Sequence, residues 1–315
     1  MTTPSYRLIG LSTILVILVT SVIARGSFNG FTVDKDALIP AEEIHSGGPP
    51  RDGIPSIDDP RFEASASASN VKPEDRILGL AYKGIARAYP IDVMNWHEIV
   101  NDRYGDEPVV VTYCPLCGSG MAFSANVSGM ETDFGVSGLL YNSDVLLYDR
   151  QTESLWSQMM SQAISGPMKG TRLTMLPLIH TTWSEWRSEH PDTQVLSRNT
   201  GDRRDYDRDP YAGYEDSTGV WFPVSKKDPR YHPKEPVLGL ELEGRYKAYP
   251  FAELSRTKGK VMDRFADHDF VVRYNPDSRS ARIIGRDGME LPAVQSYWFA
   301  WYVFHPETEV YTAPD

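Results

Sequence analysis

An internal repeat limits what this chain can fold into more than any other feature. Residues 78–90 and 238–250 share seven identities in register, namely Leu78, Gly79, Leu80, Gly84, Ala88, Tyr89 and Pro90 with Leu238, Gly239, Leu240, Gly244, Ala248, Tyr249 and Pro250. A second motif, Trp-x-x-Trp-x-x-x-His-Pro, occurs at 183–191 and again at 298–306. Residues that both copies of a repeat keep are expected to serve the fold. Residues that only one copy holds are therefore candidates for function.

The two copies differ most clearly at the two cysteines. Copy one contains Cys114-Pro-Leu-Cys117-Gly, where copy two has Asn275 and Ser278. Proline fixes its own φ, and Gly118 can adopt a left-handed conformation, so the segment predicts a tight turn. Turns of this kind hold metal ions, and they also form redox-active dithiols. The contrast between the copies places the candidate site in copy one.

Three interpretations of the cysteines stay open. In a metal site, the two thiolates and His97 would hold zinc, copper or iron, because His97 is replaced by Lys258 in copy two. In a redox site, Cys114 would be the catalytic nucleophile and Cys117 the resolving thiol. The third possibility is a non-catalytic scaffold with a structural disulfide or buried thiols, although so short a loop gives little entropic stabilisation.

Copy one also contains a surplus segment after the cysteines. The offset between the copies is 160 positions at Leu78 and Leu238 but 115 at Trp183 and Trp298, so copy one carries about 45 additional residues. We expect a pocket to include residues from this region and from the cysteine turn: Ser119, Tyr141, Asn142, Asp144, Asp149, Arg150 and Trp156. Asn142 and Asp144 are also typical turn formers, and the aromatic residues are typical of a core.

The repeat predicts an α+β fold that is rich in strands, built from two diverged copies of a hairpin–helix–strand unit. Each copy contains a two-residue turn between β-type segments, followed by a short amphipathic stretch and a buried strand. The predicted organisation is a signal peptide or membrane anchor at 1–25, an extended arm at 26–70, the first repeat at 71–200, a joining segment at 201–234 and the second, degenerate repeat at 235–315.

The N-terminal apolar run and the net charge bound the location and the partners. Residues 8–24 are an apolar stretch of a length that suits a signal peptide or a short anchor, so we expect an extracytoplasmic protein, secreted, periplasmic or membrane-tethered by this segment alone. The formal net charge of −11 argues against a nucleic-acid partner. The expected partner is a small molecule or another envelope protein.

The order of several motifs resembles a known family. Six motifs together resemble the family called domain of unknown function 3179: SGGPPRDGIP, the AYP hairpin, NWHEIVND, YCPLCGS, the GLLYNSD–LYDR–LWSQ run and TTWSEW-x-x-x-HP. The resemblance covers roughly residues 30–311. It implies an exported or membrane-tethered microbial protein and no established activity, so the predicted function is a metal-binding or thiol-redox site at Cys114 and Cys117, without an assigned substrate or enzyme class.

Overall fold

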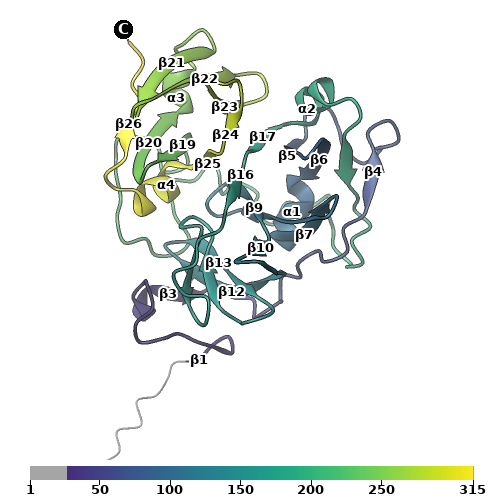
Figure 1. Ribbon diagram of the computed structural model, residues 1–315, viewed down its shortest axis with the longest axis vertical. Helices are drawn as coiled ribbons and strands as arrows, with labels where there is room; N and C mark the ends of the chain where they lie inside the picture. The colour runs from purple at the N-terminus through teal and green to yellow at the C-terminus, as the bar shows by residue number, and fades with distance from the viewer. Residues whose placement is uncertain (1–26, 315) are drawn as a thin grey trace, which may run out of the picture.

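The computed structural model describes residues 27–314 and shows a protein made mainly of strands. Strands account for 42% of it and helices for 10%, and five sheets are arranged as the blades of a β-propeller (Figure 1). Two further pairs of short strands are β1 (Ser27–Phe28) with β2 (Phe31–Thr32) and β10 (Asn126–Val127) with β11 (Met130–Glu131).

Copy one supplies two of the five sheets. The first has the order β17 (Leu178–Thr182), β5 (Arg76–Tyr82), β6 (Ile85–Pro90), β18 (Gln194–Leu196) and β4 (Phe62–Ala64). The second has the order β16 (Met175–Leu176), β9 (Ser119–Ser124), β8 (Glu107–Cys114) and β7 (Ile99–Tyr104). Neighbouring strands are antiparallel except β18 and β6, which are parallel.

Copy two supplies two equivalent sheets in the same strand order. One consists of β25 (Val294–Tyr297), β19 (Pro236–Leu242), β20 (Arg245–Pro250) and β26 (Glu309–Val310), and the pair β20–β26 is again parallel. The other consists of β21 (Lys260–Phe265), β22 (His268–Asn275), β23 (Ser280–Gly285) and β24 (Glu290–Leu291). Residues 77–123 and 237–284 thus share one arrangement of strands.

The surplus of copy one forms the fifth sheet together with the N-terminal arm. Its order is β15 (Gln162–Ser165), β14 (Leu155–Ser157), β13 (Asp144–Asp149), β12 (Phe134–Tyr141) and β3 (Ile44–Ser46). A 3-10 helix, η1 (Ala41–Glu43), precedes the arm strand β3. The arm thus adds an edge strand to a sheet, and Figure 1 shows this sheet at the lower end of the molecule.

The expected α+β class is wrong. The α-helices of residues 27–314 are α1 (Ile91–His97), α2 (Trp183–Glu189), α3 (Phe251–Leu254) and α4 (Trp298–Phe304), and none of these exceeds seven residues. They connect strands and do not form a layer of their own. The hairpin–helix–strand pattern describes only the first part of each unit. Strands much later in the chain complete the unit and turn it into two sheets.

The repeated glycines and tryptophans have a common structural role. A Cβ atom on Gly79 would lie 2.4 Å from the ring of Trp186, so only glycine allows this tryptophan to pack on the hairpin. The indole N–H of Trp186 donates to Thr193 Oγ1 at 2.8 Å. The same contacts recur in copy two between Gly239, Trp301 and Thr308. What both copies keep therefore serves the fold, as the repeat predicts.

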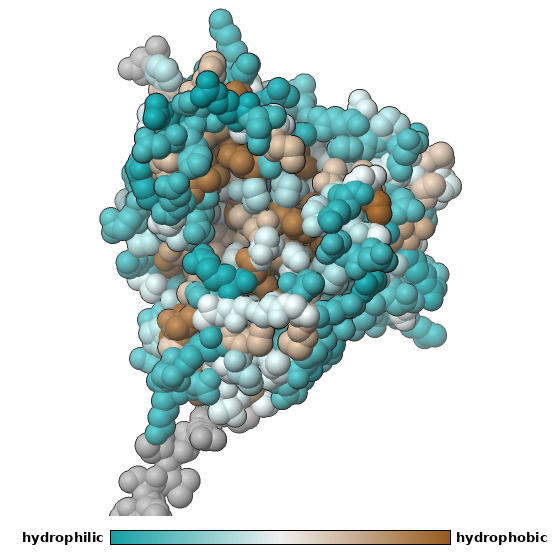
Figure 2. All heavy atoms as spheres, in the orientation of Figure 1, coloured by the Kyte–Doolittle hydropathy of each residue, from teal (hydrophilic) through white to brown (hydrophobic). Residues whose placement is uncertain are grey.

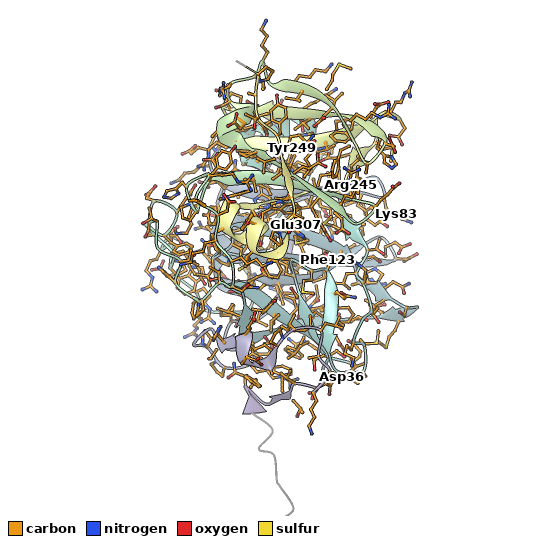
Figure 3. All side chains as sticks on the ribbon, turned by 90° about the vertical axis from the view of Figure 1, so that its left-hand side faces the viewer. Asp36, Lys83, Phe123, Arg245, Tyr249 and Glu307 are labelled. Carbon is orange, nitrogen blue, oxygen red and sulfur yellow. The ribbon has the colours of Figure 1, made fainter. Side chains whose placement is uncertain are left out.

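The two copies pack against each other in a reciprocal way. Strand β25 of copy two contacts β9 of copy one, and the equivalent strand β17 of copy one contacts β23 of copy two. The copies are thus related by an approximate twofold axis, as in a symmetric dimer. Phe123 of β9 is completely buried and lies near the middle of the view in Figure 3, whereas Asp36 of the arm lies at its lower end.

The expected N-terminal signal peptide or anchor lies outside the described residues. Within residues 27–314, no helix is long and apolar enough to cross a membrane. The division of the chain into the predicted segments stays a prediction.

Candidate metal centre

The Cys-Pro-Leu-Cys-Gly segment forms a tight turn between two buried strands. Cys114 is the last residue of β8, and β9 begins at Ser119. The Cys117 N–H donates to the Cys114 carbonyl at 3.2 Å, and Gly118 has φ of 59°. A Cβ atom on Gly118 would lie 2.8 Å from the ring of Tyr297, a residue of copy two. The turn therefore has the predicted geometry, and glycine is needed for both its conformation and its packing.

A second turn, from the surplus segment, lies against the sulfurs. Asn142 and Ser143 connect β12 to β13 with φ of 51° and 69°. The carbonyl of Ser143 accepts hydrogen bonds from both thiols, with distances of 3.7 Å from Cys114 Sγ and 3.4 Å from Cys117 Sγ. Asp144 follows directly, and its carboxylate and the two sulfurs lie within 4.8 Å of one another. The structure thus brings together two thiols and one carboxyl group.

These three side chains are shielded from solvent. The exposed fractions of Cys114, Cys117 and Asp144 are 1%, 0% and 0%. Asp144 Oδ2 accepts a hydrogen bond from the Met159 N–H at 3.0 Å, whereas Oδ1 is buried without a hydrogen-bond partner among the described residues. Burying a carboxylate oxygen with no partner costs free energy, and a bound cation would remove that cost.

A second carboxyl group, that of Glu98, is buried close enough to this group to influence it electrostatically. Burial, and secondarily the charge of Asp144, raise the pKa of Glu98 to about 8. Glu98 also has a left-handed backbone, with φ of 58°. The equivalent residue in copy two is Gly259, because Tyr113 N–H donates to the Glu98 carbonyl as Tyr274 N–H donates to that of Gly259. Copy one thus has glutamate at a left-handed backbone position, a conformation that favours glycine.

The electrostatics of the group are those of acids buried without a counter-charge. Burial raises the pKa of Asp144 to about 7, and it raises the pKa values of the Cys114 and Cys117 thiols above their ordinary range. The charge of Asp144 raises both thiol pKa values further. A divalent cation would reverse these shifts, because it stabilises thiolate and carboxylate alike.

The structure does not place His97 in this group. Its Nδ1 lies 2.8 Å from the Pro55 carbonyl oxygen, and its Nε2 lies 2.7 Å from the hydroxyl of Tyr206. Both ring nitrogens therefore have partners that hold the arm and the joining segment to α1. Asp144, predicted only as a pocket residue, has the position that the sequence had suggested for His97.

The other predicted pocket residues near the thiols have structural contacts. Ser119 Oγ donates to Gln158 Oε1 at 2.7 Å, and Asn142 Oδ1 accepts from the Ser225 N–H at 2.8 Å. The ring of Tyr141 packs edge-on against Phe304, with centroids 5.6 Å apart.

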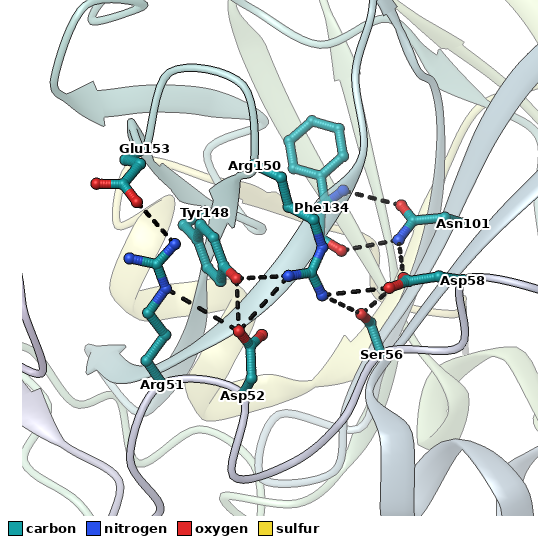
Figure 4. A network of polar contacts seen from close by, with 9 residues as sticks. All are labelled: Arg51, Asp52, Ser56, Asp58, Asn101, Phe134, Tyr148, Arg150 and Glu153. Atoms are coloured by element: carbon teal, nitrogen blue, oxygen red, sulfur yellow. Dashed lines mark hydrogen bonds and ion pairs between the residues drawn. The ribbon is translucent and has the colours of Figure 1, made fainter. Parts of the chain in front are cut away.

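Asp149, Trp156 and Arg150 hold the fifth sheet and the arm rather than the thiols. Asp149 Oδ2 accepts the indole N–H of Trp156 at 2.9 Å, within the fifth sheet. The guanidinium of Arg150 bonds to Tyr148 and Ser56 (Figure 4). No role beyond these contacts is assigned to the three residues.

The joining segment covers the thiols. Ser143 Oγ donates to the Phe222 carbonyl at 3.4 Å, and the aromatic rings of Tyr211 and Tyr214 pack in the same core as the cysteines. Burial, and then the charges of Cys117 and Cys114, raise the pKa of Tyr214. Residues between the two copies therefore help to shield the site from solvent.

The fold and the site define the class of this protein: a five-bladed propeller with a buried dithiol–carboxyl group at the joint of two diverged copies. The chain belongs to the family described as protein of unknown function (DUF3179), whose profile matches residues 51–288. Neither the curated proteins nor the solved structures include one that matches the chain.

Proposed function

We propose that the protein binds one thiophilic transition-metal ion at Cys114, Cys117 and Asp144. The observation that carries this proposal is the buried Oδ1 of Asp144, which has no hydrogen-bond partner among the described residues and lies within 4.8 Å of two sulfurs. Two thiolates and one carboxylate suit zinc, and thiolate ligands also suit copper and iron. The buried carboxyl group of Glu98 interacts electrostatically with Asp144 and would add negative charge beside the ion.

The surroundings support a metal more strongly than a free redox dithiol. A reactive thiol needs a lowered pKa and access to its partner, whereas both sulfurs here are buried and their pKa values are raised by burial. One observation favours the redox alternative, namely that both thiols donate to the same carbonyl, that of Ser143. In that case the pair would pass two electrons and two protons to a disulfide of a partner protein.

We also propose that the protein acts outside the cytoplasm, released or held by its N-terminal segment. The apolar run at 8–24 supports this location. A bound metal would protect the two thiols from oxidation in such a compartment, where unprotected thiols tend to form disulfides.

Metal analysis of protein purified without affinity-tag metals tests the proposal. We expect about one metal ion per chain in the wild type and a loss of more than about tenfold in affinity in Cys114→Ser and Asp144→Asn. Ser278→Ala changes the copy-two equivalent of Cys117 and is the matched control, with unchanged metal content expected. His97→Gln should also keep the metal.

A count of free thiols separates the alternatives. Two thiols that become reactive only after chelation support the metal site. The metal site would be rejected in favour of the redox function by one outcome. In it, the protein contains no metal, takes up none on dialysis and cycles between two thiols and one disulfide.

A further inference from the structure

A cavity of about 250 Å³ lies where the two copies meet. Three pairs of equivalent residues line it: Arg76 and Pro236, His180 and Gln295, Gly118 and Arg279. The cavity therefore lies across the approximate twofold axis, and Gly118 connects it to the cysteine turn. Figure 2 shows the hollow in the middle of the molecule, surrounded by hydrophilic residues.

Arg76 brings a positive charge to the cavity without an ion-pair partner. Its guanidinium donates to the carbonyls of Ser278 and Arg279, and no carboxylate lies within ion-pair distance among the described residues. Arg279, the second cation of the cavity, is paired with Glu215 at 2.6 Å. A partly buried guanidinium that bonds only to neutral oxygens favours an anion beside it. Copy two has a proline at the position of Arg76.

The two carboxyl groups on the cavity wall have other partners. Glu215, whose charge acts on Arg76 from beyond ion-pair distance, is paired with Arg279, and Asp209 is bonded elsewhere. Asp209 is exposed, and its Oδ1 accepts from the Asn95 side-chain amide at 3.2 Å and from the Tyr211 N–H at 2.9 Å. It does not approach Arg76 within ion-pair distance. The charge of Arg76 is thus available to a ligand.

The cavity wall also contains polar atoms without protein partners. The hydroxyl of Tyr214 and Oε1 of Gln295 are both buried and have no hydrogen-bond partner among residues 27–314. Tyr214 itself is 2% exposed. Buried polar groups of folded proteins almost always have partners, so these two atoms indicate a molecule that supplies them.

His180 adds a neutral hydrogen-bond donor. The Gly120 N–H donates to His180 Nε2 at 2.9 Å, so Nε2 is the acceptor and the ring hydrogen is on Nδ1. Burial and, secondarily, the charge of Arg76 lower the pKa of His180 to about 3. Nδ1 has no partner in the described part of the chain.

We propose that this cavity binds a small organic acid, with its carboxylate at Arg76 and its polar atoms at Tyr214 and Gln295. The volume lies just below the range typical of drug-sized ligands, so the ligand is a molecule of metabolite size. The inference does not depend on the metal, because none of these three groups is a proposed ligand of it.

Calorimetric titration of the full-length protein at constant ionic strength tests this site. The probes are acetate, propionate, succinate and inorganic phosphate, with acetamide as the uncharged analogue of acetate. We expect at least one carboxylate to bind and acetamide not to bind. Tyr214→Phe should weaken the binding about 5- to 10-fold, because it removes one hydrogen bond. Its unfolding transition should change little, since the only protein group at that hydroxyl among the described residues is the Trp221 backbone, without a hydrogen bond of ordinary geometry.

Two further variants complete the design. Arg76→Gln should weaken binding by more than about tenfold, and Tyr302→Phe, which removes a hydroxyl outside the cavity, should leave it unchanged. Arg76 also bridges the two copies, so Arg76→Gln can fail to fold. In that case the affinity measured for Tyr214→Phe tests the proposed site. Binding should persist in Cys114→Ser, whose metal site is removed. Equal binding of acetamide, tighter binding of phosphate than of any carboxylate, or unchanged affinity in Tyr214→Phe would each overturn the proposal.

Discussion

Two kinds of residue differ in what they do for this protein: some stabilise the fold, and others lie at the candidate site at a cost in stability. Gly79 and Gly239 have to be glycine because an aromatic ring occupies the place of their side chains. Glu98 is the opposite case, since a side chain is kept at a left-handed position that is glycine in copy two. The first kind of residue stabilises the repeat, whereas the second costs stability and points to a function.

Gly79→Ala should destabilise the protein strongly. The new methyl group would overlap with the ring of Trp186, and overpacking of this kind costs about 1–3 kcal/mol. Gly84→Ala in the turn is the control, because a Cβ atom there would meet no atom within 4 Å. Its only cost is that of placing alanine at a φ of 77°, about 1–2 kcal/mol. Urea unfolding measures both variants. A smaller loss for Gly79→Ala than for Gly84→Ala would contradict this account of the repeated glycine.

Glu98→Gly should stabilise the metal-free protein and weaken metal binding. The change relieves the left-handed backbone and removes a buried carboxyl group, effects worth about 1–2 kcal/mol each, against up to about 1 kcal/mol for the added freedom of glycine in the unfolded chain. Unfolding with and without metal measures both effects. The opposite change at the equivalent position, Gly259→Glu, should destabilise without affecting metal. An unchanged metal affinity in Glu98→Gly would remove Glu98 from the site.

At the scale of elements, the arm is held to the fifth sheet by a polar network. Arg150 bonds to Tyr148 at 2.8 Å and to Ser56 at 2.9 Å, and it lies 3.5 Å from Asp52 and 3.3 Å from Asp58 (Figure 4). These side-chain contacts add to the backbone pairing of β3 with β12, which also attaches the arm to the fifth sheet. The sequence suggested Arg150 as a residue at the mouth of a pocket, but the structure uses it to fix the arm.

Arg150→Ala should loosen the arm without unfolding the propeller. Partly exposed ion pairs contribute about 0–1 kcal/mol each, so global stability should fall by about 1–2 kcal/mol at most, while cleavage within residues 47–61 becomes faster. Limited proteolysis with mass spectrometry detects this. Arg103→Ala, which removes an exposed pair with Glu131, is the control. Equal cleavage rates in the two variants would show that strand pairing alone holds the arm.

At the scale of the whole molecule, Glu185 of α2 links copy one to the loop of copy two that replaces the cysteine turn. Its carboxylate accepts hydrogen bonds from Asn275 at 2.9 Å and from Ser280 at 2.7 Å. Burial opposes its ionisation, but hydrogen bonds from Ser278, Thr181, Asn275 and Ser280 outweigh burial and lower the pKa of Glu185 to about 2. The loop that binds the proposed metal in copy one thus serves as an anchor in copy two.

This link predicts a specific dependence of stability on pH. A carboxyl group with a lowered pKa stabilises the folded state above its ordinary pKa of 4.5, and this contribution is lost as the pH falls from 4.5 to about 2. After allowance for its partial exposure, we expect about 1–2 kcal/mol. Glu185→Gln should therefore be less stable at pH 7 by this amount and match the wild type near pH 2. Glu189→Gln on the same helix is the control. A constant difference across this range would exclude the link.

The sequence predicted the local features of this molecule better than its overall arrangement. The repeat, its turns and the position of Cys114 at a strand end follow from residue types with strict conformational needs, such as Gly84 and Pro115. The propeller could not be predicted, because strands such as β17 and β5 pair across about 100 residues, and no local pattern encodes such a partner. Asp144 was placed only in the pocket for the same reason. Glu98 could have been found by its alignment with Gly259.

The late pairing of β17 with β5 also has a consequence for how the chain becomes folded. The hairpin of β5 and β6 ends at residue 90, yet its neighbours β17 and β18 begin at residues 178 and 194. This sheet of copy one cannot be completed until about 100 further residues have been synthesised, and contacts so distant in sequence make folding slow. A newly made chain therefore stays open for longer than one built from local contacts. For the export proposed above, that delay would leave time for a translocation machinery to move the chain before it becomes compact.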